Sequence, residues 1–316
     1  MTNSVRILLQ TTIPYAEDDW HIGRFSLLAD ELASLKDEAG NALYEVSARN
    51  RESDANGNDP VLSNLDRSDF DELWLFAIDL GDGLTVPDCQ GITRFRQRGG
   101  GILATRDHED LGTSLCTLGG IGRAHFFHSK NPEPDESRRV VDDKFTTSIS
   151  WPNYHSGANG DYHTINVAAP HELLRKPDGN MIKFFPAHPH EGAVGTPEGE
   201  QQARVIATAK SETTGREFNL IVAFESERDD HGNQLGRGIA ESSFHHFVDY
   251  NWDTDMGCPS FLQEPPGDGY KRHPQALEDI KAYVGNAARW LAGTKEQAND
   301  EAVAITGTAG VSPASS

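Results

Sequence analysis

The feature that most constrains this fold is the alternation of short apolar runs with helical patterns in the first third of the chain. Between the runs, apolar residues recur three or four positions apart, as on one face of a helix. Strands that alternate with helices form βαβ units, whose right-handed crossovers build a parallel sheet covered on both faces. The strand-like runs cover residues 5–9, 44–48, 71–78 and 102–105, and the helical patterns cover residues 25–35 and a segment from Pro87 to the glycines at 99–101.

The middle of the chain is much less regular. Residues 130–215 are rich in Pro, Gly, Asn, His and acidic side chains and contain few periodic segments. Disordered segments are poor in aromatic residues, whereas this one contains Trp151, Tyr154 and Tyr162 among others. We therefore expect a long, irregular and at least partly packed insertion in the second half of the protein.

The remainder of the chain returns to regular patterns. Two further strands are expected, followed by a helix whose apolar residues keep helical spacing. The strands cover residues 217–224 and 238–242, and the helix follows Pro274 and ends near Leu291. The sequence beyond is small and polar, so we predict a single α/β domain over residues 1–292 and a flexible C-terminal tail over residues 293–316.

The charge balance narrows the classes of function. The chain has 28 Lys and Arg against 49 Asp and Glu, a net charge of −21, whereas nucleic-acid binders need clustered basic residues for phosphate contacts. No apolar run approaches the roughly 18 to 20 residues that cross a bilayer, and no signal-peptide pattern opens the chain. The three cysteines lack C-x-x-C spacing and are typical of reduced thiols. We expect a cytoplasmic protein that binds a small molecule and interacts with neither nucleic acid nor a membrane. The protein could be a monomer or a homo-oligomer.

The residues that follow the fourth predicted strand are the first candidates for chemistry. Ligands of parallel α/β sheets bind at the carboxyl ends of the strands, and this position reads Arg106-Asp-His-Glu-Asp110. Imidazole titrates near neutral pH, so His108 is the acid/base candidate, with Asp107 or Glu109 as its orienting partner. Arg106 is a candidate ligand contact in the same run.

Histidines recur in short segments elsewhere in the chain. In an extended segment His188 and His190 would share a face, whereas His245 and His246 would face opposite ways, so at most one of that pair would point into a given site. Neutral imidazole is a common metal ligand, and such clusters suit a metal or an acid/base site. The alternative is that these histidines bond to backbone groups in loops and fill polar positions of the core. The candidate ligand-binding residues are Arg106, His128, His188, Glu191, His245 and His246, and the candidate ligands of a divalent metal are His108, His128, His190 and His245.

A cysteine nucleophile is not indicated. A nucleophile elbow places Cys or Ser directly after a strand, between small residues, whereas Cys116 lies well beyond the strand end in Thr-Ser-Leu-Cys-Thr. We interpret it as a buried helical cysteine. The glycines at 99–101 are interpreted as a turn, because phosphate-binding glycine loops follow a strand and these precede one.

Several of these segments follow one another in a familiar order. They are the strand in residues 69–76, the glycines at 99–101, the strand leading to His108, Ile121-Gly122 followed by Phe126-Phe-His128, Gly236-Arg237 with a strand running to Ser243 and His245-His246, and Arg289-Trp-Leu291. In this order the chain resembles the class I glutamine amidotransferase-like superfamily and, within it, the ThuA-like (trehalose-utilisation-like) proteins.

The resemblance implies a flavodoxin-like parallel sheet whose pocket uses histidines in place of the amidotransferase Cys-His-Glu triad. His108 and His128 would line this pocket, and His245 or His246 would enter it from the last strand. His188-Pro-His-Glu191 would stand where the family has an acidic dipeptide followed by an aromatic residue. Members of the family are tied to carbohydrate use, which implies a sugar derivative as the ligand.

Three functions are therefore compared. The leading hypothesis is an enzyme or enzyme-like protein, a hydrolase or isomerase, that handles a carbohydrate-type molecule through a histidine and carboxylate pocket. In it, His108 is the acid or base, and His128, His190 and His245 contact a metal or the substrate. The second is a non-catalytic binding or assembly module that has lost the nucleophile. The third, glutamine hydrolysis through Cys116, is the least favoured.

Overall fold

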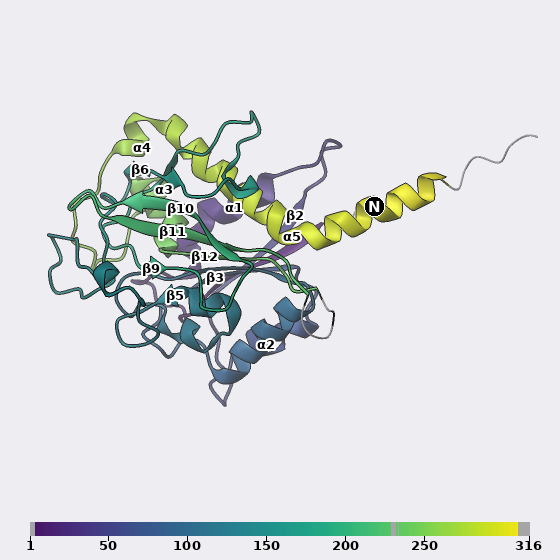
Figure 1. Ribbon diagram of the computed structural model, residues 1–316, viewed down its shortest axis with the longest axis horizontal. Coiled ribbons are helices and arrows are strands. Elements are labelled where there is room, and N and C mark those ends of the chain that lie inside the picture. Colours follow the sequence, from purple (N-terminus) through teal and green to yellow (C-terminus); the bar gives the residue numbers. More distant parts are fainter. Residues whose placement is uncertain (1–3, 229–231, 233, 309–316) are drawn as a thin grey trace, which may run out of the picture.

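A mixed eight-stranded sheet forms the centre of the protein in the computed structural model, which describes residues 4–228, 232 and 234–308 (Figure 1). The strand order is β2-β1-β3-β4-β12-β11-β10-β7, parallel from β2 to β12 and antiparallel from there on. With β12 as the fifth strand, the parallel part has the 2-1-3-4-5 order of flavodoxin-like folds, which confirms the predicted fold class. In spatial order the strands are β2 (Tyr44–Arg49), β1 (Val5–Thr11), β3 (Glu72–Phe76), β4 (Gly101–Thr105), β12 (Gly238–Glu241), β11 (Glu217–Phe224), β10 (Ala203–Lys210) and β7 (Asn166–Val167).

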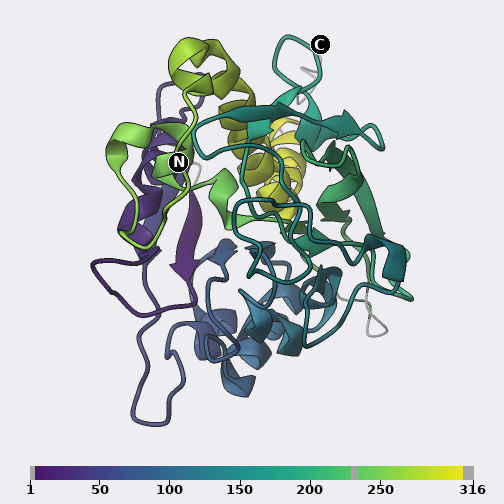
Figure 2. The ribbon, with the colours of Figure 1, turned by 90° about the vertical axis from the view of Figure 1, so that its left-hand side faces the viewer.

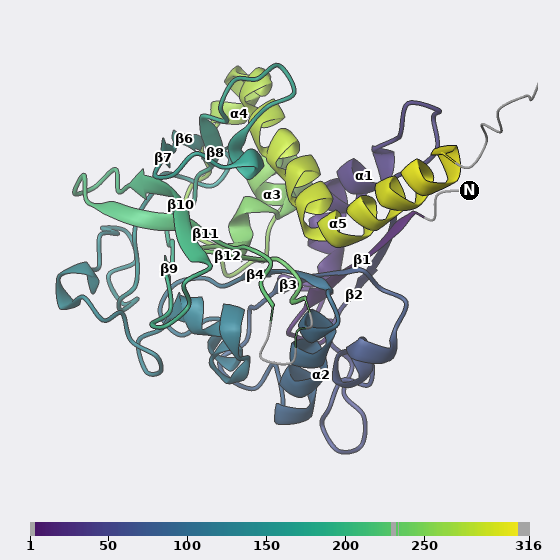
Figure 3. The same ribbon diagram turned by 45° about the vertical axis from the view of Figure 1, so that its right-hand side comes forward.

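Helices cover both faces of this sheet, as a parallel sheet requires. On one face, α1 and α5 bury Leu32 and Val284 in one part of the core, and on the other α2 buries Ile92 and Phe95 in a second. Figure 3 shows α2 below the sheet and α1 and α5 above it. The helices are α1 (Ser26–Ser34), α2 (Val86–Gln97), α3 (Asp249–Trp252), α4 (Gly269–Arg272) and α5 (Leu277–Thr308).

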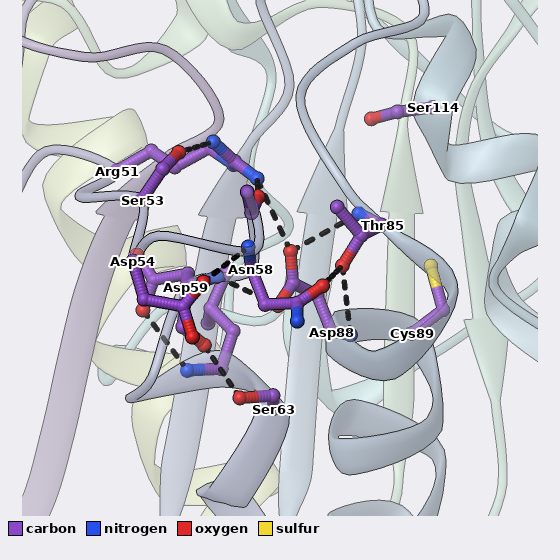
Figure 4. A network of polar contacts seen from close by, with 12 residues as sticks. Arg51, Ser53, Asp54, Asn58, Asp59, Ser63, Thr85, Asp88, Cys89 and Ser114 are labelled. Atoms are coloured by element: carbon purple, nitrogen blue, oxygen red, sulfur yellow. Dashed lines mark hydrogen bonds and ion pairs between the residues drawn. The ribbon is translucent and has the colours of Figure 1, made fainter.

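The start of α2 is fixed by a network of polar contacts (Figure 4). Thr85 and Asp88 form a capping box, in which each side chain accepts a hydrogen bond from the other residue's backbone amide. The second Asp88 oxygen accepts from the Asp59 amide at 2.9 Å, and the Asp59 carboxylate pairs with Arg49 of β2 at 2.8 Å. The helix is followed by Gly99, whose φ of +96° suits glycine at this position. The helix predicted for this segment is confirmed.

A long insertion joins β4 to β12. It adds β7, β10 and β11 to the sheet, and it also contains the long irregular stretches seen in teal and green in Figure 2. Tyr154 stacks on Phe218 of β11 with the ring centroids 4.8 Å apart, so the insertion is packed against the sheet as its aromatic content predicted. Two small antiparallel sheets complete it, β5 (His125–Phe126) with β9 (Ala193–Val194) and β6 (Tyr162–Thr164) with β8 (Phe184–Pro186).

The closing helix extends farther than predicted. It runs to Thr308, whereas the sequence analysis placed its end near Leu291 and a tail from 293 onward. Residues 295–302 include Ala, Glu, Lys and Gln, which have high helix propensity. The stretch has few apolar residues, so it lacks the periodic pattern by which a helix is predicted. Residues 309–316 of the predicted tail lie outside the described residues. Even with α5 at this length, no helix in the described part of the chain is both long and apolar enough to cross a membrane.

Candidate functional site

A cavity of about 530 Å³ lies at the carboxyl ends of the parallel strands. Its size falls within the roughly 300 to 1,000 Å³ of small-molecule sites, and its position is the usual one for ligands of α/β sheets. Residues that follow the strand ends form one side, and the insertion and the loop after α3 form the others. They include Ile13, Ile78, Asp79, Asp107, His108 and His245 from the strand ends, His188 and His190 from the insertion, and Phe261, Leu262 and Glu264 from the loop.

Asp107 is the central carboxylate of this cavity wall. It is only 2% exposed, and its oxygens lie 3.3 Å from His108 Nδ1, 3.5 Å from His188 Nδ1 and 3.7 Å from His245 Nε2. These distances are long for hydrogen bonds, and Asp107 Oδ1 has no hydrogen-bond partner among the described residues. Asp107, His108, His188, His190 and His245 are called the pocket cluster below. All five are among the residues that the sequence predicts for a site.

The four imidazoles of the pocket cluster pack against one another. The rings of His188 and His245 stack with their centroids 3.6 Å apart and their planes 12° apart. The His190 ring stands edge-on to those of His108 and His188, at 5.1 and 5.6 Å. The Trp20 indole lies edge-on to His245 at 4.8 Å. Three separate segments of the chain therefore place their histidines on one wall.

Hydrogen bonds hold His190 at both of its ring nitrogens. Nδ1 lies 3.2 Å from Asn153 Oδ1 and 3.3 Å from Asp143 Oδ2, and Nε2 lies 3.0 Å from Glu264 Oε1. The ring thereby connects the insertion to the loop after α3, and it has no free nitrogen for a ligand.

His245 is held at one nitrogen only. Its Nδ1 lies 3.2 Å from Asn251 Oδ1, while Asn251 Nδ2 donates to Asn159 Oδ1 at 3.0 Å and to the Ala187 carbonyl at 2.8 Å. Because the Asn251 nitrogen is used as a donor, its oxygen accepts the proton of His245 Nδ1. His245 Nε2 is then left with a lone pair on the side of Asp107.

The neighbouring His246 points the opposite way, into the core. It is fully buried, with Nδ1 2.9 Å from Glu241 Oε2 and Nε2 3.3 Å from Glu191 Oε1, and the Tyr283 hydroxyl donates to the other Glu241 oxygen. Glu191, Glu241, His246, Tyr283 and the adjacent buried His163 are called the core cluster below. Of the two neighbouring histidines only His245 lines the cavity, and the segment is a 3-10 turn, Phe244–His246, where the sequence predicts an extended one.

The neighbouring histidines His245 and His246 hold opposite charge states. In the pocket cluster, burial lowers the pKa of His188 well below its usual value and lowers the pKa of His245 to about 4. Burial also acts to lower the pKa of His246, but the carboxylates of Glu191 and Glu241 outweigh it and raise that pKa to about 10. Near neutral pH, His188 and His245 are therefore neutral, whereas His246 is a buried imidazolium.

Three of the predicted site residues lie outside the cavity. Arg106 is fully buried, its guanidinium donating to the Glu109 carbonyl at 2.6 Å and lying 4.1 Å from the Phe127 ring centroid. Glu109 itself takes a left-handed backbone conformation with φ +46° and does not line the cavity. His128 is exposed, with Nδ1 3.0 Å from Ser150 Oγ. The prediction that His128 lines the pocket is wrong, because its segment continues from β5, which pairs with β9 in a separate small sheet.

Two further predicted ligand contacts are also corrected. Glu191 and His246 are both 0% exposed and belong to the core cluster, so neither reaches the cavity. Glu191 is further fixed by hydrogen bonds from the hydroxyls of Ser156 at 2.9 Å and Ser242 at 2.8 Å. The alternative reading, in which such residues fill polar positions of the core, holds for these two.

Cys116 takes no part in the cavity. It lies in a short 3-10 helix, Thr113–Thr117, and burial raises the pKa of its thiol to about 11. Such a thiol is almost entirely protonated at neutral pH and is a poor nucleophile. No cysteine or serine of the described chain lines the cavity.

Sequence reasoning missed several residues of the wall. Asp19 and Trp20 lie in the loop after β1, and applying the strand-end rule to β1 as well as to β4 would have found them. Asn251 and Glu264 come from segments after the last strand, and no pattern in the sequence connects them with the histidines that they hold.

Comparisons with known proteins give similarity in structure alone. No protein-family model and no curated protein sequence matches the chain. One similar solved structure is the mmIFT52 N-terminal domain, at 12% identity and a TM-score of 0.49, with 90% of this chain and 97% of that chain covered. A ThuA-like protein from Parabacteroides merdae is 15% identical with a TM-score of 0.44, covering 92% and 91%. The glutaminase domain of Trypanosoma brucei CTPS with bound acivicin is 11% identical with a TM-score of 0.45, covering 90% and 94%.

Proposed function

We propose that the protein binds and transforms a small, neutral, carbohydrate-type molecule in the cavity at the strand ends, using the histidines and carboxylate of the pocket cluster. The reaction would be a hydrolysis or an isomerisation driven by acid/base chemistry. The observation that carries the proposal is that Asp107, although 2% exposed, faces three imidazoles on the wall of a cavity of ligand size.

The lining of the cavity favours a neutral polyhydroxylated ligand. The acidic residues Asp19, Asp82 and Glu264 line it, and carboxylates accept hydrogen bonds from hydroxyl groups. The same carboxylates, together with a net charge of −21, disfavour an anionic ligand. Trp20 supplies an aromatic wall beside them, and the resemblance of the sequence to ThuA-like proteins supports the same class of ligand.

Within the pocket cluster, His108 is placed for proton transfer. Its side chain is 18% exposed, more than those of the other pocket histidines, and its Nδ1 lies 3.3 Å from Asp107 Oδ2. A carboxylate at this distance orients an imidazole. His108 would therefore act as the general acid or base, and Asp107 would position it.

A ligand screen tests the proposal. The melting temperature of the full-length protein is measured with a panel of neutral mono- and disaccharides and their derivatives, because a ligand that binds the folded state raises it. We expect at least one to stabilise the wild type and to lose its effect in His108→Ala. His128→Ala is the matched control, since that histidine is exposed outside the cavity. A response that is equal in wild type and His108→Ala would contradict the proposal.

A non-catalytic binding module is the second candidate. It is favoured by one observation, the absence of a cysteine or serine nucleophile from the cavity lining of the described chain. Turnover separates the two candidates: a ligand that stabilises the protein, yet is recovered unchanged at every pH after prolonged incubation, would favour the binding module.

A further inference from the structure

Three side chains of the pocket cluster bring their donor atoms together without hydrogen bonds between them. Asp107, His188 and His245 each offer one ligand atom, and these atoms all lie within 4.8 Å of one another. The contacts to the Asp107 carboxylate are 3.5 Å for His188 Nδ1 and 3.7 Å for His245 Nε2. Nitrogen and oxygen donors about 2.1 Å from one ion lie about 3 to 3.5 Å from each other. We propose that these three residues bind one divalent transition-metal ion of the Zn²⁺ class at the cavity wall.

The hydrogen bonds behind His245 prepare it as a ligand. Asn251 accepts the Nδ1 proton, because its own nitrogen is committed to Asn159 and to the Ala187 carbonyl. The Nε2 lone pair of His245 is thereby directed toward Asp107. Metal-binding histidines usually donate their second ring proton to such an oxygen, which fixes the tautomer and the ring orientation.

The carboxylate of Asp107 needs a partner that the protein does not supply. Asp107 Oδ1 has no hydrogen bond among the described residues, although the side chain is almost fully buried, and an unpaired buried carboxylate oxygen is unfavourable. His188 Nδ1, which lies 3.5 Å from this oxygen, makes a long 3.4 Å contact with Ser243 Oγ. A cation between the three donors would satisfy the carboxylate and both imidazoles together.

The neighbouring histidines are not available as ligands in the same way. Both nitrogens of His190 are already bonded, and both nitrogens of His246 in the core cluster contact carboxylates. His108, whose Nδ1 lies 3.3 Å from Asp107 Oδ2, is not one of the three ligands and stays free for proton transfer. The ion would then have three protein ligands and open positions toward the cavity, which is the arrangement of catalytic sites.

This metal site deepens the proposed function, and it rests on the proposal that the cavity is where the ligand binds. Two imidazoles and one carboxylate suit Zn²⁺, Fe²⁺ or Mn²⁺ better than Ca²⁺ or Mg²⁺, which prefer all-oxygen sites. An ion with open positions can bind a ligand hydroxyl or carbonyl and lower the pKa of a bound water. The metal would thus supply the electrophile for the acid/base chemistry of His108.

Metal titration of the full-length protein tests the site. The protein is stripped with a chelator and dialysed, and ZnCl₂ binding is measured by calorimetry, with the visible spectrum of added Co²⁺ as a second readout. We expect one ion per chain in the wild type. Asn251→Ala should weaken binding by about 10- to 100-fold, as loss of an outer hydrogen-bond partner does, and Asp107→Asn and His245→Gln should weaken it further. His128→Ala should bind like the wild type.

The outcomes separate this inference from the proposed function. Absence of Zn²⁺ and Co²⁺ binding in the wild type, or equal affinity in wild type and Asp107→Asn, would overturn the metal site. Asp107→Asn is nearly isosteric, and far-UV circular dichroism shows whether each variant is folded. A sugar-induced rise in melting temperature that survives chelation, without metal binding, would leave the proposed function standing alone. One bound ion without any response to the sugar panel would support the metal site and contradict the proposed ligand class.

Discussion

His245 and His246 are neighbours in the chain, yet they belong to clusters with opposite chemistry. In the pocket cluster one carboxylate, Asp107, faces several imidazoles at 3.3 to 3.7 Å. In the core cluster two carboxylates, Glu191 and Glu241, enclose the imidazole of His246 at 3.3 and 2.9 Å. His245 is neutral and keeps a lone pair on the side of Asp107, whereas both nitrogens of His246 are used in ion pairs.

The difference shows that two buried histidines next to each other in the chain take opposite charge states according to the carboxylates that each one contacts. Burial disfavours the charged form in both clusters. Two carboxylates outweigh that effect for His246, whereas Asp107, shared among its neighbours, does not outweigh it for His245. His246, with both nitrogens in ion pairs, contributes to the core, whereas His245 remains available for a ligand.

The largest expected effect comes from removing the buried imidazolium. In His246→Gln the carboxylates of Glu191 and Glu241 lose the charge between them, and breaking a buried ion pair costs about 3 to 5 kcal/mol. His245→Gln should cost much less, because its ring makes no ion pair at hydrogen-bond distance. Urea unfolding at pH 7 measures both free energies. Equal losses in the two variants would break the comparison between the clusters.

A smaller, pH-dependent effect is expected at His163, the second histidine of the core cluster. Burial lowers its pKa to about 4, and neither of its ring nitrogens has a hydrogen-bond partner among the described residues. The unfolded chain takes up this proton below about pH 6.5 and the folded protein only below about 4, so stability falls as the pH drops between these values. The total loss is on the order of 3 kcal/mol.

This pH effect is measured as a difference between two proteins, because many carboxyl groups also titrate in the same range. Unfolding free energies of wild type and His163→Phe are compared from pH 7 to pH 4. The wild type should lose more stability than the variant as the pH falls. Parallel curves would show that His163 does not stay neutral beside His246.

A still smaller loss of stability is expected when Tyr283 of the core cluster is replaced by Phe. The Tyr283 hydroxyl donates a hydrogen bond to Glu241, and a hydrogen bond to a charged group contributes about 1.5 to 3 kcal/mol. Because Glu241 keeps its contact with His246, we expect Tyr283→Phe to lie near the lower limit. Thermal unfolding measures it, and the affinity of the cavity for ligand should not change. A loss of ligand affinity would mean that the two clusters are coupled.

The smallest effect is expected for the histidine outside both clusters. His128 is exposed and contacts Ser150 and Trp151 at the surface. Its replacement by Ala should change the unfolding free energy by less than about 0.5 kcal/mol, without effect on ligand or metal binding. A marked loss of ligand binding or of metal binding in His128→Ala would support the role in the pocket that the family resemblance implied for this residue.

The sequence allowed the parallel sheet and part of the cavity to be predicted, for a physical reason. Strand and helix periodicities are local, and the carboxyl ends of parallel strands meet at one edge, so His108 and Asp107 could be placed without knowing the tertiary structure. The prediction for His128 failed, because the direction of the chain after a strand depends on distant partners such as β9.

The residues that hold the histidines could not be predicted in the same way. Asn251 and Glu264 act through single hydrogen bonds to His245 and His190, and a single polar residue in a loop carries no periodic signal. The sequence likewise predicted that only one of His245 and His246 would point into the cavity, but not which one. Alternation shows that neighbouring side chains point in opposite directions, and it does not show which direction is inward.

The pairing of β4 with β12 has a consequence for how the protein folds. Gly238 pairs with Ile102 in parallel register, although the whole insertion separates the two strands in sequence. Contacts between such distant parts of a chain raise the contact order and slow folding, because the loop must close before the contacts form. On the ribosome, β1 to β4 emerge long before their fifth parallel partner. We therefore expect the cavity, which needs residues from both sides of the insertion, to be completed among the last parts of the molecule.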